Sequence, residues 1–229
     1  RAASRSTGIP VDLDAARTVM QSRGIFLVED AAQALGAEYK EKKVGTIADF
    51  GFFSLCRGKG VTIYEGGVVV TANEKYIPAL EETMAWLEKK DILSEGLKIL
   101  ELIGYWVFYR PSLFWFVFKA PQNFWLKRGD PVRAMAEHAD VHFSTHRVSA
   151  VRKAYGHATF PRLGKEIDSQ RKRAAEYFRG LEGLPGIQVI KEIPDTKANY
   201  PYVTVVFNDE KKRDQALAAI NKEGLGASI

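Results

Sequence analysis

The spacing of apolar residues predicts a helix and then buried strands in the first third of the chain. From Asp12, a plausible N-cap, apolar residues recur on one helical face until Gly24. The continuous apolar run over residues 25–28 is typical of a buried parallel strand. Residues 50–55 and 68–71 predict two more strands. A helix followed by strands in this order predicts an α/β sheet domain.

The second half of the chain predicts mainly helices. Residues 77–97 and 149–181 show amphipathic, helical spacing. Residues 187–190 and 202–207 predict strands, the latter by their β-branched content, and residues 212–223 predict another helix. This last group of elements resembles the start of a small α+β domain.

An aromatic-rich stretch separates these two regions. It holds ten aromatic side chains between Tyr105 and Trp125 and is broken by Pro111 and Pro121. It is too interrupted for a transmembrane helix, which needs roughly 20 consecutive apolar residues. Aromatic residues with a few basic ones are typical of a peripheral membrane contact and also of a subunit interface. We favour a dimer or domain interface, because the rest of the chain is ordinary soluble sequence.

Composition narrows the function classes. A formal net charge of +5 is mild for 229 residues, and the basic residues are interspersed with acidic ones, which argues against a nucleic-acid partner. The single cysteine, Cys56, excludes an internal disulfide and suits a reducing cytoplasm. The chain begins with arginine, and we expect both of its ends to be cut from a longer protein.

Two residues are placed for chemistry. Asp30 follows the strand predicted at residues 25–28, at the end where open α/β sheets bind ligands. Lys59 follows the strand at residues 50–55 and has a glycine on each side, which lets the backbone approach a ligand. Taken alone, such an aspartate is more often a cap and such a lysine a solvated charge. Pyridoxal phosphate chemistry, however, requires both an acid for the pyridine nitrogen and an amine for a Schiff base.

The runs over residues 28–34 and 53–59 resemble the DegT/DnrJ/EryC1/StrS family of pyridoxal 5′-phosphate-dependent sugar aminotransferases. Ser54 and Lys59 keep the five-residue spacing between the family's phosphate-binding serine and its Schiff-base lysine. The resemblance implies the following site: Asp30 at the pyridine nitrogen, Ala32 on one ring face, Gln33 at the ring hydroxyl, Ser54 at the phosphate and Lys59 as the Schiff-base residue and proton carrier.

The resemblance also implies an activity and a fold. Family members move an amino group from glutamate or glutamine to a keto-sugar, usually nucleotide-linked, in surface-polysaccharide or secondary-metabolite biosynthesis, and are usually cytoplasmic homodimers. A sister branch replaces the lysine with histidine and dehydrates sugars, so Lys59 favours transamination. We expect part of the large domain of a fold-type-I transferase at residues 1–97, the aromatic-rich segment at residues 98–145 and the start of a truncated small domain at residues 146–229.

The chain departs from the family at several positions. Tyr64 replaces the first glycine of a Gly-Glu-Gly-Gly or Gly-Asp-Gly-Gly turn, and Glu41 and Ala48 stand where glycines are usual. Thr145 replaces an asparagine that reaches the partner's cofactor, while Arg147 of that motif is retained. The resemblance covers only the middle of the family, and we expect the first and last segments to be missing. The alternative is therefore a truncated non-catalytic homologue that acts as a partner subunit or peripheral membrane protein.

Histidines offer a weaker alternative. His138, His142 and His146 recur every fourth residue, as metal ligands on a helix would. Their neighbours favour strand and loop, and no cysteine or carboxylate completes a ligand set. We therefore expect no metal site and no nucleophilic role for Cys56.

Overall fold

The computed structural model describes residues 2–3, 7–87, 92–110, 112–113, 115–116, 120–128, 145–223 and 227. Contacts between residues divide the chain into two compact units. Unit 1 consists of residues 1–54, 68–72 and 162–229, and unit 2 of residues 55–67 and 73–161. The domain boundaries expected from the sequence stay a prediction.

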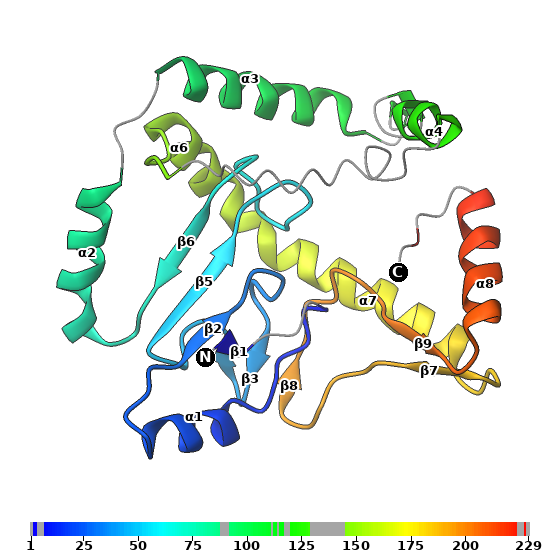
Figure 1. The fold of residues 1–229 in the computed structure, drawn as a ribbon, viewed down its shortest axis with the longest axis horizontal. Coiled ribbons are helices and arrows are strands. Elements are labelled where there is room, and N and C mark those ends of the chain that lie inside the picture. Colours follow the sequence, from blue (N-terminus) through cyan, green and yellow to red (C-terminus); the bar gives the residue numbers. More distant parts are fainter. Residues whose placement is uncertain are drawn as a thin grey trace. The chain divides into compact units, whose positions relative to one another are not determined.

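Unit 1 is built on a mostly parallel sheet. Its strands are β1 (Ala2–Ala3), β2 (Val28–Asp30), β5 (Phe50–Ser54) and β6 (Gly67–Val70), in the spatial order β1-β2-β5-β6 (Figure 1). Strand β2 is parallel to both β1 and β5. This arrangement confirms the predicted α/β class.

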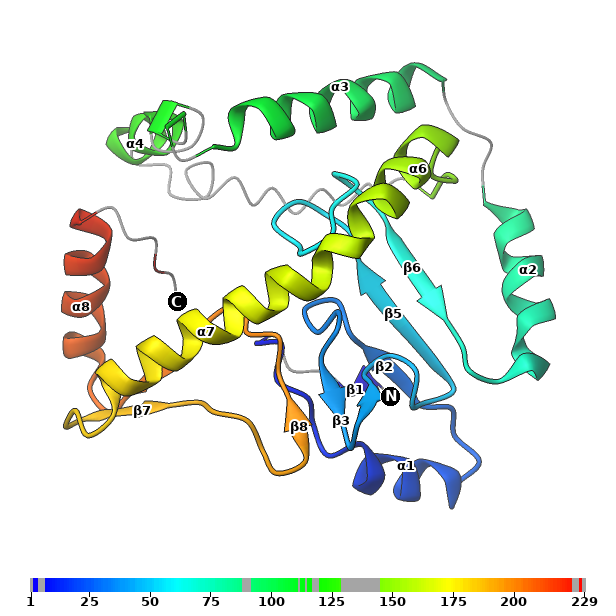
Figure 2. The same ribbon diagram turned by 180° about the vertical axis from the view of Figure 1, so that it is seen from behind.

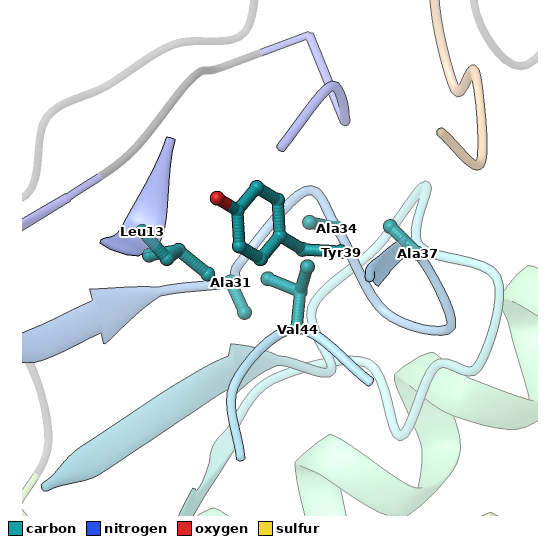
Figure 3. Close-up of a cluster of buried hydrophobic side chains, with 6 residues drawn as sticks. All are labelled: Leu13, Ala31, Ala34, Ala37, Tyr39 and Val44. Carbon is teal, nitrogen blue, oxygen red and sulfur yellow. The ribbon is translucent and has the colours of Figure 1, made fainter. Parts of the chain in front are cut away.

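Helix α1 (Leu13–Gln21) begins where the sequence predicts, because the Asp12 carboxylate accepts the Ala15 N–H at 3.1 Å. The Tyr39 hydroxyl donates to the same carboxylate at 3.0 Å. Tyr39 thus connects the helix to β3 (Glu38–Tyr39), which pairs with both β4 (Lys42–Lys43) and β8 (Thr196–Lys197). Figure 3 shows the hydrophobic cluster around this ring: Leu13, Ala31, Ala34, Ala37, Tyr39 and Val44.

The prediction of a strand at residues 25–28 is wrong by about three residues. Ile25 and Phe26 are exposed, and the Leu27 N–H donates to the Asp49 carboxylate at 2.9 Å instead of joining a strand. The strand begins only at Val28. Asp30 is consequently the last residue of β2 and not a residue beyond it.

The C-terminal part of unit 1 follows the predicted order. Helix α7 (Leu163–Leu181) precedes β7 (Ile187–Val189), which pairs antiparallel with β9 (Val205–Phe207), and α8 (Glu210–Lys222) ends the group. The single helix predicted at residues 149–181 is divided. A 3₁₀ turn, η3 (Phe160–Arg162), separates α7 from α6 (Ala150–Thr159), because Pro161 within it lacks the N–H that helix continuation needs.

Unit 2 is mainly helical in its described part. A 3₁₀ turn, η1 (Glu74–Tyr76), leads into α2 (Ile77–Trp86), and α3 (Ile92–Phe108), α4 (Ala120–Lys127) and α6 follow (Figure 2). The helix predicted at residues 77–97 is therefore two helices. Among the described residues, no helix has both the length and the apolar character to cross a membrane.

Candidate functional site

Asp30 and Ser54 end two neighbouring parallel strands. The register pairs Asp30 of β2 with Phe52 of β5, so Ser54 stands two residues farther along β5 at the same edge of the sheet. Both side chains are half-buried. This edge, at the carboxyl ends of the strands, is where open α/β sheets bind their ligands.

The Asp30 carboxylate has one oxygen engaged. Its Oδ1 accepts the Ala32 N–H at 3.1 Å, a short turn that an aspartate side chain commonly forms. In the described part of the chain, no residue donates a hydrogen bond to Oδ2. One carboxylate oxygen is therefore left as an acceptor for a protonated ligand atom, which fits the role expected for Asp30.

Backbone hydrogen bonds hold the turn that follows Asp30. The Ala31 N–H donates to Phe52 O at 3.0 Å, and the Ala34 N–H donates to Ala31 O at 2.9 Å. The buried Asn199 amide donates to Gln33 O at 2.9 Å. Ala32 and Gln33 consequently stand on a segment that is tied at both ends, as a binding segment requires.

The chain packs closely against this turn at Gly8, because this residue has no side chain. Its φ is +73°, and a Cβ there would meet the Asn199 side-chain oxygen at 2.1 Å and Gln33 O at 2.9 Å. Only glycine combines this conformation with this approach.

Glu29 is a buried carboxylate that the sequence reading did not single out. Its two oxygens accept the backbone N–H groups of Gly45 at 2.6 Å, and of Ile47 and Ala48 at 2.7 Å each. Successive side chains of a strand point to opposite faces, so Glu29 fixes the turn at residues 45–48 while Asp30 faces the other way. Glu29 therefore supports the strand that carries Asp30.

Lys59 lies in unit 2, in the loop that joins β5 to β6. The Leu55 N–H donates to Gly66 O at 2.9 Å, the Arg57 N–H to Tyr64 O at 3.1 Å and the Lys59 N–H to Cys56 O at 3.3 Å. These bonds close the loop into a defined hairpin. The Lys59 side chain is half-buried, and Gly58 before it has a φ of +78° with open space around its Cα.

Two of the three departures from the family's glycines fall on left-handed backbone. Glu41 has a φ of +63° and Tyr64 a φ of +75°. Glycine adopts this region without cost, whereas other L-residues are strained there. The Tyr64 ring has the Arg57 guanidinium 5.1 Å from its centroid, a favourable contact that offsets part of the strain.

Unit 2 also contains a buried ion-pair network. Arg152 Nε donates to Glu95 Oε2 at 3.1 Å, and its Nη1 donates to the carbonyl of Glu65 in the Lys59 loop. Burial opposes ionisation of Glu95. Hydrogen bonds from Arg152, Ser149 and His146 outweigh it and hold the pKa of Glu95 well below its usual range.

The expected site residues fall into both units. Asp30, Ala32, Gln33 and Ser54 belong to unit 1, and Lys59 belongs to unit 2. His146 Nε2 lies 2.8 Å from Glu95 Oε1. His138 and His142 lie outside the described residues. The residues that the structure does describe contain no cluster suited to a metal ion.

Comparison with known proteins bears on these residues. Residues 5–95 match the model of the DegT/DnrJ/EryC1/StrS aminotransferase family. The resemblance predicted from the sequence is confirmed. A UDP-N-acetyl-3-dehydro-α-D-glucosamine 3-aminotransferase from Acidithiobacillus ferrooxidans is 27% identical over 97% of this chain and 47% of its own length. The chain thus spans about half the length of the curated relatives it matches.

Solved structures agree on the fold. The aminotransferase TlmJ from Streptoalloteichus hindustanus matches 97% of this chain and 49% of its own, with a TM-score of 0.66 at 18% identity. An Escherichia coli GDP-4-keto-6-deoxy-D-mannose-3-dehydratase with bound hydrated PLP matches 97% of this chain and 50% of its own, with a TM-score of 0.63 at 17% identity. The α/β fold of these proteins is therefore shared by this chain over about half of their length.

Proposed function

We propose that the protein is a pyridoxal 5′-phosphate-dependent aminotransferase that moves an amino group from glutamate or glutamine to a keto-sugar. The observation that carries the proposal is the placement of Asp30 and Ser54 at the carboxyl ends of neighbouring parallel strands, inside the segment matching the family model. The A. ferrooxidans relative is named for a UDP-linked dehydro sugar, which supports a nucleotide-linked substrate. Surface-polysaccharide or secondary-metabolite biosynthesis is the proposed setting.

Five residues hold the cofactor in this proposal. Asp30 keeps a proton on the pyridine nitrogen, because a nearby carboxylate raises the pKa of a cationic partner. The remaining contacts are Ala32 against the ring face, Gln33 to the ring hydroxyl, Ser54 to the phosphate and Lys59 in covalent linkage to the aldehyde carbon.

Lys59 also moves a proton. The cofactor supplies an electron sink when bound. Lys59 Nζ would act as the base that takes the α-proton of the donor amino acid and holds it during the transfer. With the keto-sugar, Lys59 acts in the reverse direction. Asp30 keeps the proton on the pyridine nitrogen through both half-reactions.

Lys59 also distinguishes transamination from dehydration. The fold itself does not separate the two reactions, since an aminotransferase and a dehydratase both match it. The lysine, which the dehydrating branch replaces with histidine, favours amino transfer. The alternative of a non-catalytic homologue is not favoured, because Asp30, Gln33, Ser54 and Lys59 are all retained.

We further propose that the protein works in the cytoplasm as a homodimer. The single cysteine suits a reducing compartment, and the family resemblance implies that two subunits build each site. Sedimentation velocity should give a species of twice 25.6 kDa. A monomer at all concentrations would contradict the proposed dimer. The cofactor proposal is tested separately.

The activity is tested by incubating the protein with cofactor, glutamate or glutamine, and UDP-linked 3-keto sugar. Mass spectrometry should detect the amino sugar with the wild type and none with Lys59→Ala. A matched control, Lys42→Ala in the exposed turn strand β4, should retain activity. A product that has lost a hydroxyl group as water, keeps the keto group and has gained no nitrogen would indicate dehydration and contradict the proposal.

A further inference from the structure

Helix α3 buries a glutamate and exposes a stripe of apolar residues. Soluble proteins normally bury the apolar stripe of a helix and expose its polar face. In α3, Glu95 is only 4% exposed, whereas Ile92 is 87% and Leu93 75% exposed. At 100° per residue, five of the exposed apolar residues of α3 form one continuous stripe: Ile92, Leu93, Leu97, Leu100 and Ile103.

The inner side of α3 is fixed by polar contacts within unit 2. Glu95 is held by Arg152 and His146, and Lys98 pairs with Glu65. Rolling the helix to bury the stripe would leave the buried Glu95 charge without its partners, which is strongly unfavourable. In Figures 1 and 2, α6 and the β5–β6 loop, which belong to the same unit as α3, lie on one side of this helix.

The charge of the following segment indicates what covers the stripe. Residues 102–128 contain four arginines and lysines, no aspartate or glutamate, and three of the four tryptophans of the chain. The Arg110 guanidinium lies 5.3 Å from the Trp106 ring centroid, and the Arg128 guanidinium lies 4.1 Å from that of Phe124. Basic groups beside exposed aromatic rings suit an anionic lipid surface.

A second copy is a poorer match for this face. A two-fold interface brings the same patch of both subunits together. Residues 102–128 would then meet their own positive charge without an acidic partner. The sequence alone favoured an interface for residues 105–125, but this one-signed charge reverses the preference.

We propose that the exposed stripe of α3, together with Trp106, Arg110, Phe124 and Arg128, docks on an anionic membrane surface. The helix lies in the plane of the interface, since it is 17 residues long and does not span. Its inner side meets the loop of Lys59, because Lys98 of α3 pairs with Glu65 of that loop. Docking therefore brings this loop to within ~10 Å, about one helix diameter, of the lipid headgroups.

Vesicle sedimentation with the full chain tests the docking. Vesicles of phosphatidylcholine with phosphatidylglycerol should bind the protein at least about tenfold more tightly than phosphatidylcholine alone, and salt should weaken the binding. Leu97→Gln with Leu100→Gln should reduce binding about tenfold or more. The control Val151→Gln alters an equally exposed apolar residue of α6 and should leave binding unchanged.

Three results would overturn the proposal. They are no vesicle binding by the wild type, equal binding to both lipid compositions, and self-association that the Leu97 and Leu100 changes abolish while vesicles stay unbound. The last result would assign the stripe to an interface between copies. The dependence of wild-type binding on lipid composition and salt is measured without any variant. The proposal can therefore still be tested if the double variant fails to fold. Arg110→Gln should lower only the preference for anionic lipid.

Discussion

Arg152 and Glu95, 57 residues apart in the chain, form a buried ion pair that joins α6 to α3. Arg152 also donates to the carbonyls of Ile63 and Glu65. One guanidinium therefore connects two helices to the loop that carries Lys59. Neither residue belongs to a motif in the sequence, yet both determine where that loop sits in unit 2.

Replacing Arg152 should be costly. Arg152→Met leaves the buried Glu95 carboxylate without its main partner, and we expect a loss of about 3–5 kcal/mol in the free energy of unfolding. Urea denaturation measures it. Arg147→Met, at an exposed arginine nearby, should change stability by less than about 0.5 kcal/mol. Equal effects of the two changes would contradict the central role of Arg152.

Stability should depend on pH through Glu38 in unit 1. Hydrogen bonds from Lys43 and Lys197 outweigh desolvation and lower the pKa of Glu38 to about 2. Because the folded pKa lies below the unfolded value of about 4.5, this contribution is complete above pH 4.5 and is lost as pH falls toward 2.

The variant Glu38→Gln isolates the contribution of the Glu38 carboxylate to the free energy of unfolding. The free-energy difference between wild type and variant should be about 1 kcal/mol at neutral pH, since both lysines are largely exposed, and should vanish near pH 2. Glu41→Gln, in the same hairpin and exposed, should show no such pH dependence. A difference that grows on acidification would have the wrong sign for this assignment.

Glu29→Gln should destabilise the turn next to the site. The amide nitrogen of glutamine cannot accept a hydrogen bond, so at least one of the N–H groups of Gly45, Ile47 and Ala48 loses its acceptor. We expect a cost of about 1–3 kcal/mol by chemical denaturation. The control Glu176→Gln, at an exposed position of α7, should be nearly neutral; a neutral Glu29→Gln would refute the anchoring role.

Glu41→Gly should stabilise the protein. Glu41 occupies left-handed backbone, which costs a non-glycine residue about 1–2 kcal/mol, while the added flexibility of glycine in the unfolded chain returns part of this. We expect a net gain of about 0.5–1 kcal/mol in thermal or urea unfolding. Lys42→Gly, one residue later in extended β4, should instead lower stability. A loss at both positions would show that Glu41 is not strained.

Asp30→Asn should separate folding from chemistry. The asparagine oxygen can still accept the Ala32 N–H, so we expect stability to change by less than about 0.5 kcal/mol. Amino transfer should fall by about 100-fold or more, because the neutral side chain no longer stabilises a protonated ring nitrogen. Activity close to that of the wild type, with the fold intact, would exclude Asp30 from the proposed role.

Local signals in the sequence predicted local structure well. The Asp12 cap, the strand at residues 50–54 and the helix at residues 210–222 each depend on neighbouring residues, and they appear within two residues of the predicted places. The apolar run at residues 25–28 misled the prediction. Asp49 bonds Leu27 from 22 residues away, and no local pattern contains that contact.

The supporting residues of the site could not be predicted for the same reason. In the sequence, nothing distinguishes Glu29 from a solvated glutamate beside Asp30. Its three hydrogen bonds form only when the turn at residues 45–48 folds onto β2. The family resemblance pointed to Lys59 and Ser54, but not to Glu95 and Arg152, which fix the loop of Lys59 by a tertiary contact. The exposed apolar stripe of α3 could not be predicted, because helical spacing alone does not say which side of a helix is covered.

The most direct test of the account is whether Lys59 binds pyridoxal phosphate covalently. The purified protein is incubated with the cofactor and gel-filtered, its visible absorbance is recorded, and borohydride reduction with peptide mapping locates the label. We predict a retained yellow species whose label maps to Lys59 and is absent from Lys59→Ala. A label on another lysine, or no retained cofactor, would contradict the aminotransferase assignment.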